Sequence, residues 1–299
     1  MVTKKKVLVI GKNGQLGSEI GHQAQSFLDL NFTFTSSAEL DLTDSAQMVN
    51  YFSSNRYDVV INCAAYTNVE GAEASEEEAR LVNAIGVKNL AELCFLNKIF
   101  LIHISTDYVF DGSTGYPINE DVTPNPLGVY GRTKLEGEQF IIVSGCDHLI
   151  FRISWLYSQF GDNFVKTIAN LSASKKELKV VYDQVGTPTS SIDFSRFLLK
   201  IIEDGNYLKF QGIYHYANQG VCSWYDFAYQ IVQILQHDCR VVPVLSDEYP
   251  SKVKRPNYVV LNKRKLCKHF RVEISHWNDS LRHFLTNHKG LICNNQISI

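Results

Sequence analysis

A short apolar run near the N-terminus is followed at once by three evenly spaced glycines. Val7–Ile10 leads directly into Gly11, and Gly14 and Gly17 follow before a helical pattern begins. Glycine permits a tight turn and a close approach of the main chain to a pyrophosphate, whose charge the first amides of a helix stabilise. The GxxGxxG spacing is one residue wider at its start than the usual dinucleotide motif, so a purely structural turn stays open. The order of strand, turn and helix predicts a nucleotide-binding unit.

Short apolar runs continue to alternate with helix-like segments over the first half of the chain. We expect strands at 7–10, 32–35, 58–65, 99–106 and 148–154, and helices at 15–28, 44–54, 75–97 and from residue 130 onward. This alternation predicts an α/β fold, a Rossmann-type doubly wound parallel sheet that binds ligands at the carboxyl ends of its strands. Asp44 is expected to cap the second helix, and Ser75 with Glu78 to form a capping box at the third.

From about Trp155 the alternation becomes irregular. We expect helices at 162–173, 191–203, 223–237 and 276–288, and short strands at 179–182, 212–218 and 240–244. The sequence contains no long linker and no repeat, so a tethered module is not expected. Residues 1–154 are therefore predicted to form an NAD(P)-binding Rossmann domain, and residues 155–299 mainly a small α/β substrate lobe. Later segments are expected to return to the first domain.

The composition argues against several classes of protein. The formal net charge is −2, so no overall attraction to nucleic acid or to an anionic membrane is evident. No apolar run is long enough to span a bilayer. The seven cysteines are scattered and show no CxxC pair, which argues against a disulfide framework and a zinc site. We expect a cytoplasmic protein with a small-molecule partner.

Tyr130 and Lys134 lie four residues apart in an expected helix, so their side chains share one face. A free phenol has a pKa of about 10, and a nearby cation lowers it. The pair therefore suits a general acid, although two unrelated neighbours on a surface helix show the same spacing.

The choice of cofactor depends on the end of the second expected strand. Its sequence, FTSS, carries neither the acid that favours a ribose 2'-hydroxyl nor an arginine. Lys12 in the glycine loop either meets a 2'-phosphate or is a solvated lysine. We expect NADPH, with NADH also accepted. Asp41 is a candidate for contact with the adenine amino group.

Seven motifs occur in an order that resembles the extended short-chain dehydrogenase/reductase family and, more narrowly, its dTDP-4-dehydrorhamnose reductases. They are GKNGQLG, DLTD, NCAAYTNVEGAE, VNA at 82–84, STDYVFDG, YGRTKLEGE and RISWLY. The resemblance covers residues 6 to 262. It implies an oxidoreductase of dTDP-rhamnose biosynthesis, which reduces the C4 ketone of dTDP-6-deoxy-L-lyxo-4-hexulose to give dTDP-L-rhamnose.

The resemblance also implies roles for individual residues. Thr106 would bind the substrate carbonyl, Tyr130 would donate the proton, and Lys134 would lower the pKa of Tyr130 and hold the nicotinamide ribose. The implied cofactor-binding residues are Gly11, Asn13, Gly14, Gln15, Leu16, Gly17, Asp41, Leu42, Ala64, Ala65, Tyr66, Tyr130 and Lys134. The implied substrate-binding residues are Thr67, Val69, Thr106, Asp107, Tyr108, Tyr130, Trp155 and Arg255.

Some of these assignments have alternatives. Trp155 is equally compatible with a core position, and Arg255 either binds a nucleotide diphosphate or belongs to a solvated basic loop. Some family members hold Mg²⁺ at a dimer contact through an acid in the glycine loop. Gln15 is neutral here and only Asp193 is a nearby acid, so we expect no metal and either a monomer or a homodimer.

Three other functions stay open at this stage. One is reduction of another nucleotide-linked 4-keto-6-deoxy sugar, giving a talose or dihydrostreptose product. Another is a non-catalytic NADP-binding regulatory subunit, resembling that of methionine adenosyltransferase. A third is an epimerase or dehydratase, which is disfavoured because Tyr108, and not a second acid, follows Asp107.

Overall fold

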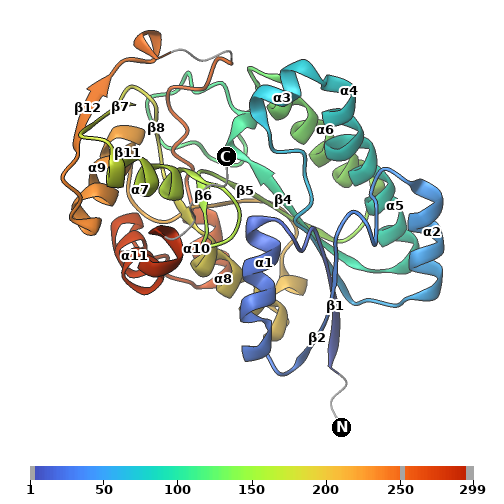
Figure 1. Cartoon of the computed structure of the whole chain (residues 1–299). Coiled ribbons are helices and arrows are strands. Elements are labelled where there is room, and N and C mark those ends of the chain that lie inside the picture. The colour runs from blue at the N-terminus through green and yellow to red at the C-terminus, as the bar shows by residue number, and fades with distance from the viewer. Residues whose placement is uncertain (1–3, 250–252, 294–299) are drawn as a thin grey trace.

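The computed structural model of the chain describes residues 4–249 and 253–293 (Figure 1). Its centre is a six-stranded sheet of order β10-β5-β4-β3-β1-β2, in which every neighbouring pair is parallel. The strands are β1 Lys5–Ile10, β2 Leu30–Thr35, β3 Val59–Asn62, β4 Phe100–Thr106, β5 His148–Ile153 and β10 Gly212–Tyr216. Strand order reverses next to β1, and ligands of such sheets bind at this switch point.

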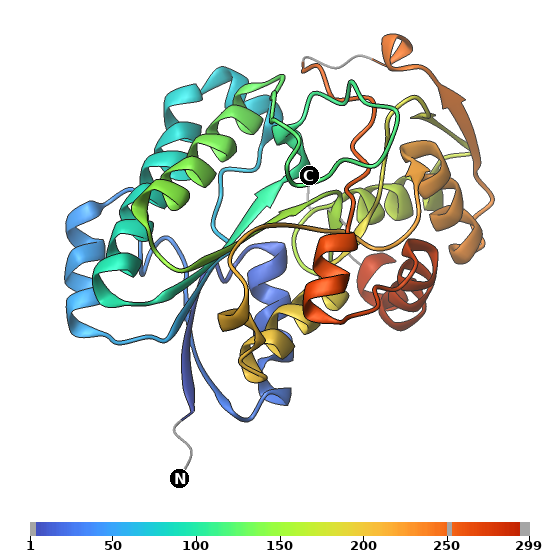
Figure 2. The ribbon, with the colours of Figure 1, turned by 180° about the vertical axis from the view of Figure 1, so that it is seen from behind.

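Apolar side chains on both faces of the sheet explain why helices cover both. Along β1, Val7 and Val9 pack in one core while Leu8 and Ile10 pack in another, because successive side chains of a strand point to opposite faces. In Figures 1 and 2 the two helix layers lie on either side of the sheet. The first layer comprises α1 Gln15–Gln23, α8 Ser191–Glu203 and α10 Arg264–Phe270; the second comprises α2 Ser45–Ser54, α5 Gly86–Asn97 and α6 Val129–Ser144. This arrangement confirms the predicted doubly wound α/β fold.

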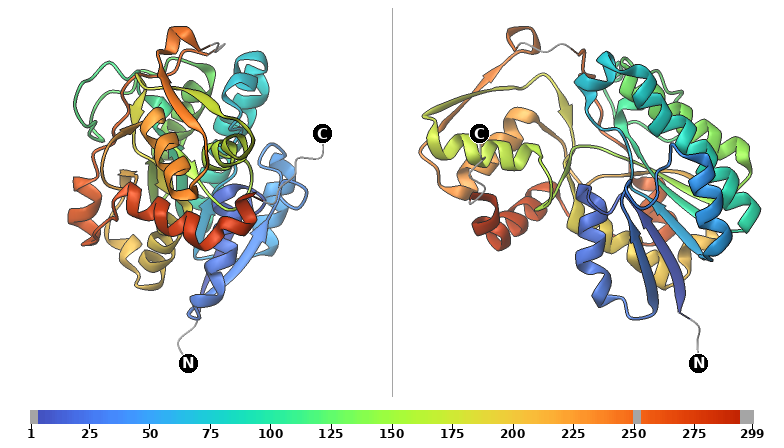
Figure 3. Two further views of the ribbon diagram at one scale, coloured as in Figure 1. Left: turned by 60° about the vertical axis from the view of Figure 1, so that its left-hand side comes forward. Right: turned by 45° about the vertical axis from the view of Figure 1, so that its right-hand side comes forward.

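A second cluster of elements lies beside the carboxyl ends of the strands (Figure 3). Its core joins Ile168, Val180, Phe227 and Phe284, which come from three helices and one strand. The larger elements are α7 Phe164–Ser174, α9 Trp224–Leu235, α11 Trp277–Cys293, and the parallel pair β7 Glu177–Val181 and β12 Arg240–Val244. Two-residue strands complete it: β6 Leu156–Tyr157 pairs with β9 Thr189–Ser190, and β8 Val185–Gly186 pairs with β11 Cys222–Ser223.

The expected helix at 75–97 differs from the observed structure. It consists of α4 Glu76–Arg80, a π-helical turn Leu81–Ile85, and α5. Ser75 is the N-cap of α4 but its side chain makes no capping bond, so the predicted capping box is wrong. The φ and ψ of Ser75, −138° and 60°, depart from the extended conformation that N-cap residues usually adopt. The prediction for Asp44 is confirmed, since its carboxylate accepts from the main-chain nitrogen of Gln47 at 2.9 Å.

Parts of the second half return to the central sheet. The strand expected at 212–218 is β10, which extends the sheet beyond β5, and α8 packs against α1. The domain boundary after residue 154 stays a prediction. A division at that point places β10 and α8 with the second half of the chain. Within the described ranges, no helix is both long and apolar enough to cross a lipid bilayer.

Candidate active site

The glycine loop packs too tightly for side chains at two of its positions. Gly11 has a φ of +88°, and a Cβ there would lie 2.8 Å from the main-chain nitrogen of Ala64. A Cβ on Gly17 would overlap the main-chain oxygen of Gly11. Gly14 is the N-cap of α1 and has no side chain to cap it, so the first-turn amides keep their capacity to bind an anion. The loop at the β1 switch point therefore fits a pyrophosphate.

The other predicted cofactor-binding residues near the glycine loop differ in the groups that they can present to a ligand. The side chains of Leu16 and Leu42 are buried in opposite cores, so only their main chains remain for a ligand. Asn13 is exposed. The Asp41 carboxylate accepts from both the main-chain nitrogen and the hydroxyl of Thr43, at 2.8 Å each, so any contact with adenine shares it with this turn.

Glu39 is a residue that the sequence reasoning missed. Its carboxylate accepts from the main-chain nitrogen and the hydroxyl of Ser36, the first residue after β2, and pairs with Lys12 at 2.7 Å. These bonds, the one from Lys12 foremost, lower the pKa of Glu39 to about 2. An acid is therefore present at the end of β2, brought there by a turn and not by the strand itself. Its ion pair with Lys12 is the signal that could have identified Glu39. The two residues lie 27 positions apart in the sequence.

The segment after β3 lies beside the glycine loop and is held by a buried asparagine. Asn83, in the π-helical turn, accepts from the main-chain nitrogen of Tyr66 at 2.8 Å and donates to its oxygen at 3.0 Å. The same amide donates to Thr133 on α6 at 3.1 Å. Residues 64–69 are thus fixed between β3 and α6, with Ala65 part-buried, Thr67 exposed and Val69 beginning α3 (Val69–Ala74).

Thr106 ends β4 and lies next to Tyr130 at the start of α6. Thr106 is buried, its hydroxyl donates to Asp107 at 3.1 Å, and a hydrogen bond between Thr106 and Tyr130 lowers the pKa of the phenol. The ring of Tyr108 meets that of Tyr130 edge to face, with centroids 5.5 Å apart. Burial raises the pKa of Asp107 to about 7, and its Oδ2 has no hydrogen-bond partner among the described residues.

Lys134 is close to these residues but its ammonium is directed elsewhere. Its Nζ donates to the main-chain oxygen of Ile104 at 2.7 Å and lies 3.2 Å from Nε2 of His103. Burial is the largest influence on Tyr130 and raises the pKa of the phenol well above its usual value. Lys134 is not among the groups that shift it, so the expected lowering by the lysine is not found in this structure. Lys134 binds β4 instead.

A buried ion pair also holds α6 against the sheet. Arg152 on β5 donates to Glu138 on α6 through Nε and Nη2, and the Nη2–Oε2 distance is 2.6 Å. Ser105, beside Thr106, also donates to Glu138. Both charged side chains are at most 2% exposed, and the guanidinium lies over the Phe110 ring at 5.1 Å. The pair therefore joins α6 to the ends of β4 and β5.

One cavity beside the second cluster is lined by both cations and aromatic rings. Its volume is about 690 Å³, and Phe164, Trp224, Lys179, Lys254 and Arg255 are among the residues that line it. The Nε atom of Arg255 is buried without a hydrogen-bond partner among the described residues. Arg255 also lowers the pKa of Tyr108, although burial outweighs it, so the arginine lies near Tyr108.

Trp155 lies at the junction between the sheet and this cavity. It has a φ of +49° and stacks on Trp224, with centroids 3.6 Å apart and planes 12° apart. Phe164 packs against the same ring of Trp224 at 4.5 Å. Trp155 is part-buried and packs against the core of the second cluster, so both a core role and a contact with the sugar stay open.

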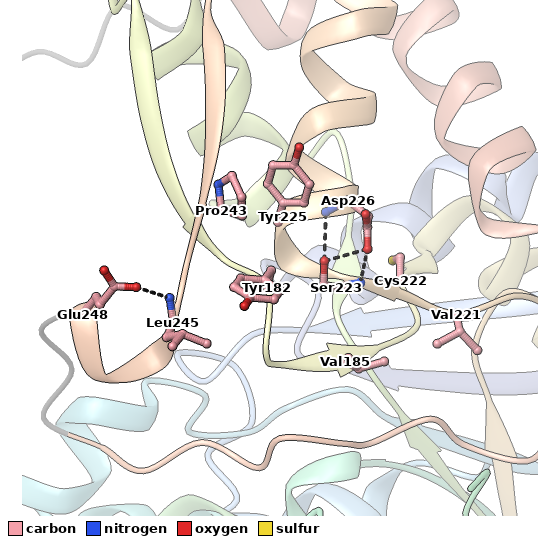
Figure 4. A pocket seen from close by; sticks show the side chains of 10 residues that line it. All are labelled: Tyr182, Val185, Val221, Cys222, Ser223, Tyr225, Asp226, Pro243, Leu245 and Glu248. Atoms are coloured by element: carbon pink, nitrogen blue, oxygen red, sulfur yellow. Dashed lines mark hydrogen bonds between the residues drawn. The ribbon is translucent and has the colours of Figure 1, made fainter. Parts of the chain in front are cut away.

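A second hollow of about 650 Å³ has no chemistry of this kind (Figure 4). Three of its polar side chains bond to their own local main chain: Ser223 and Asp226 form a capping box at the start of α9, and Glu248 accepts from the main-chain nitrogen of Leu245 at 2.8 Å. None of its residues was predicted as a site residue. It is therefore not the candidate active site.

The residues considered for a metal have other partners. Gln15 accepts from Asn163 at 3.1 Å, which links the glycine loop to α7. Asp193 accepts from Asn218 at 2.9 Å and from Ser280 at 2.5 Å. Over residues 4–249 and 253–293, no group of three or more His, Cys, Asp or Glu side chains is placed to hold a metal ion.

Comparison with known proteins agrees with this geometry. Residues 5–289 match the model of the family described as the RmlD substrate binding domain. The dTDP-4-dehydrorhamnose reductase of Mycolicibacterium smegmatis is 38% identical over 94% of this chain and 85% of its own length.

Two solved structures have the same fold over nearly their whole length. A crystal structure of a dTDP-4-dehydrorhamnose reductase from Clostridium acetobutylicum has a TM-score of 0.90 and 41% identity, and covers 95% of this chain and 99% of its own. The enzyme of that name from Bacillus anthracis, solved in complex with NADP, has a TM-score of 0.90, 33% identity and the same coverage. The chain belongs to the RmlD substrate-binding-domain family.

Proposed function

We propose that this protein is an NAD(P)H-dependent reductase that converts dTDP-6-deoxy-L-lyxo-4-hexulose to dTDP-L-rhamnose. The observation that carries the proposal is the meeting of Thr106 and Tyr130 at the carboxyl end of β4, beside a glycine loop at the switch point of the sheet. Relatives with the reductase name share its length and fold, and the structure from Bacillus anthracis is a complex with NADP.

The side chains present suit reduction of a ketone. When bound, the nicotinamide cofactor supplies hydride to the carbonyl carbon. The Thr106 hydroxyl, which donates to Asp107 in this structure, would turn to donate a hydrogen bond to the carbonyl oxygen as negative charge develops on it. Tyr130, next to Thr106, donates the proton that the oxygen takes up. Because its pKa is raised by burial, Tyr130 holds that proton firmly at neutral pH until the oxygen becomes more basic.

The cofactor fits residues at the glycine loop. The uncapped first turn of α1 would bind the pyrophosphate, and residues 64–66 would lie along the nearby ribose. Lys134 would reach the nicotinamide ribose with the hydrogens that Ile104 does not accept. Lys12 and Glu39 together would face the adenosine ribose, the lysine favouring a 2'-phosphate and the acid a 2'-hydroxyl.

The cavity of the second cluster is the place we assign to the substrate. Arg255 has a free buried Nε and would pair with the diphosphate, while Phe164 and Trp224 offer faces for the base. Trp155 and Tyr108 would then enclose the sugar between the cavity and Tyr130. Thr67, Val69 and Asp107 stay predicted sugar contacts. A metal-free monomer or homodimer also stays a prediction.

The test is identification of the product. Purified protein is incubated with NADPH and enzymatically generated dTDP-6-deoxy-L-lyxo-4-hexulose, and the product configuration is determined by NMR. We expect dTDP-L-rhamnose, in amounts equal to the NADPH consumed. A product of different configuration at C4, or NADPH oxidation only with another nucleotide-linked keto sugar, would contradict the proposal. No oxidation with any keto sugar would favour a non-catalytic role.

A further inference from the structure

One carboxamide in the cavity assigned to the substrate has a fixed orientation and no role so far. Gln184 lies between β7 and β8, is half-buried, and lines the same cavity as the rings of Phe164 and Trp224. Its Nε2 donates to the hydroxyl of Ser246 at 2.9 Å. Among the described residues, its Oε1 has no hydrogen-bond partner. The amide oxygen is therefore available to a ligand.

The bonds of Ser246 decide which way the amide of Gln184 points. The hydroxyl of Ser246 lies 2.7 Å from Oδ1 of Asp183, and its main-chain nitrogen lies 3.1 Å from Oδ2. A carboxylate only accepts, so Asp183 uses the single hydroxyl hydrogen of Ser246. The hydroxyl oxygen must then accept from Gln184, which requires the NH₂ group on that side. An amide turned the other way would bring two acceptors together, so Oε1 faces away from Ser246.

The main chain around Gln184 is held on both sides. The nitrogen of Tyr182 donates to the oxygen of Val244 at 3.0 Å, and the nitrogen of Val185 donates to the oxygen of Asn257 at 2.7 Å. These bonds tie the segment to β12 and to a second wall of the cavity. The position of the amide is therefore fixed together with its direction.

A fixed amide recognises one pattern of hydrogen bonds on a base. An amide oxygen accepts an N–H, and thymine and uracil carry one at N3, whereas N3 of cytosine is itself an acceptor. Trp224 and Phe164, whose ring centroids are 4.5 Å apart, supply faces on which a base would stack. We propose that Gln184, oriented by Ser246, accepts the N3–H of a pyrimidine-2,4-dione and makes the site selective for thymine or uracil nucleotides over cytosine nucleotides. The inference rests on the assignment of this cavity to the substrate under the proposed function.

Asn257 is the other carboxamide among the described residues that line the cavity. It is exposed, and its Nδ2 donates to the main-chain oxygen of Asp183 at 3.2 Å. Water replaces a missing partner at an exposed amide, whereas a half-buried group loses more when the ligand does not match it. Discrimination between bases is therefore assigned to Gln184 and not to Asn257.

The first test measures binding and requires no turnover. The purified unsubstituted protein is titrated calorimetrically with dTDP, with dCDP, and with N3-methyl-dTDP, which lacks the N3–H. We expect dTDP to bind about tenfold more tightly than either of the others, the effect of one hydrogen bond. The inference would be overturned if dTDP did not bind, or if it bound no more tightly than dCDP or the methylated nucleotide.

The second test asks whether Gln184 causes the preference. Gln184→Met keeps the length of the side chain and removes the amide, so the preference for dTDP over dCDP should fall to within about a factor of two. Gln211→Met is the matched control, because Gln211 is an exposed glutamine bonded to Asp147 and does not line the cavity. It should keep the full preference. A preference that persists in Gln184→Met would assign the base to another group and overturn the inference.

A third variant tests the orientation itself. Ser246→Ala removes the acceptor that holds the NH₂ group of Gln184 but keeps the main-chain bond to Asp183, so the loop stays in place. The amide is then able to turn and present its NH₂ group to N3 of cytosine. We expect dCDP to bind roughly three- to tenfold more tightly than to the unsubstituted protein. An unchanged affinity for dCDP would mean that Ser246 does not set the direction of the amide, and would contradict the inference.

These outcomes separate the inference from the proposed function. If the preference for dTDP depends on Gln184 but no keto sugar is reduced, the inference stands and the proposed reduction fails. If the keto sugar is reduced while dTDP and dCDP bind equally, the reduction stands and the inference fails. If Gln184→Met does not fold, the affinity of Ser246→Ala for dCDP decides the inference.

Discussion

The Nζ atom of Lys134 donates to the main-chain oxygen of Ile104 over 2.7 Å. This bond ties α6 to β4 one turn after Tyr130 and two residues before Thr106. The lysine therefore helps to set the position of the helix face that carries the phenol against the strand end that carries the hydroxyl. Arg152 and Glu138 make the corresponding connection one turn further along α6.

Glu39→Gln should shift the preference of the enzyme toward NADPH. The substitution removes a carboxylate that would repel a 2'-phosphate and leaves Lys12 without its partner. We expect the ratio of kcat/KM for NADPH to that for NADH to rise by roughly three- to tenfold. Steady-state kinetics with both cofactors measure this ratio. Asp238→Asn, which breaks an exposed ion pair with Lys176, is the matched control. An unchanged or lower ratio in Glu39→Gln would place the acid away from the ribose.

Asp107→Asn should stabilise the protein at alkaline but not at acid pH. The pKa of Asp107 is about 7 in the folded chain against 3.8 ordinarily, so the folded state binds more protons than the unfolded state between these values. Its stability therefore falls as pH rises through this window. Removing the group should raise the free energy of unfolding by roughly 1–3 kcal/mol at pH 8, relative to the effect at pH 4. Chemical denaturation at both pH values measures it, and equal effects at both would refute the assignment.

Breaking the buried ion pair from one side should cost far more than replacing it whole. Glu138→Gln leaves the Arg152 guanidinium buried without a counter-charge, and we expect a loss of about 3–5 kcal/mol in the free energy of unfolding. Glu138→Leu combined with Arg152→Met should lose much less than the sum of the two single changes. Urea denaturation of the unsubstituted protein, of Glu138→Leu, of Arg152→Met and of the double variant measures the coupling. Additive losses would mean that the two charges do not depend on each other.

Gly17→Ala should weaken cofactor binding because the new Cβ overlaps the main-chain oxygen of Gly11 and displaces the loop. We expect the Kd for NADPH to rise by an order of magnitude or more, about 1.4 kcal/mol per factor of ten. Gly115→Ala is the control, since a Cβ there meets no atom within 4 Å. Calorimetric titration measures both. Equal affinity in the two variants would show that the loop does not depend on Gly17.

Local patterns in the sequence predicted the frame of the fold well. The strands from β1 to β5 and the helices between them follow from apolar runs and periodicity, and Asp44 caps α2 as its residue type indicates. The two-residue strands and the short helices α3 and α10 were missed, because such short elements are set by tertiary pairing and carry little periodicity of their own. The π-helical turn at 81–85 was missed for a similar reason. It contains Asn83, whose bonds to Tyr66 and Thr133 are tertiary contacts.

Sequence motifs predicted the residues of the candidate site. They did not predict the contacts that support those residues. Thr106 and Tyr130 could be identified because their spacing and order resemble a known family. Glu39 could not, because its role comes from a partner, Lys12, that lies 27 residues away in sequence. The lowering of the Tyr130 pKa by Lys134 stays a prediction, since helical spacing fixes a shared face but not the direction of a long side chain, and Nζ is bonded to Ile104 here.

The most direct test of the account is the rate of NADPH oxidation by Tyr130→Phe with dTDP-6-deoxy-L-lyxo-4-hexulose, followed at 340 nm in parallel with the unsubstituted protein. Phenylalanine keeps the ring contact with Tyr108 and removes only the hydroxyl. We predict that kcat falls by about 10²–10⁴-fold while the Kd for NADPH stays within about a factor of two. Turnover close to that of the unsubstituted protein would show that another group donates the proton, and would contradict the account.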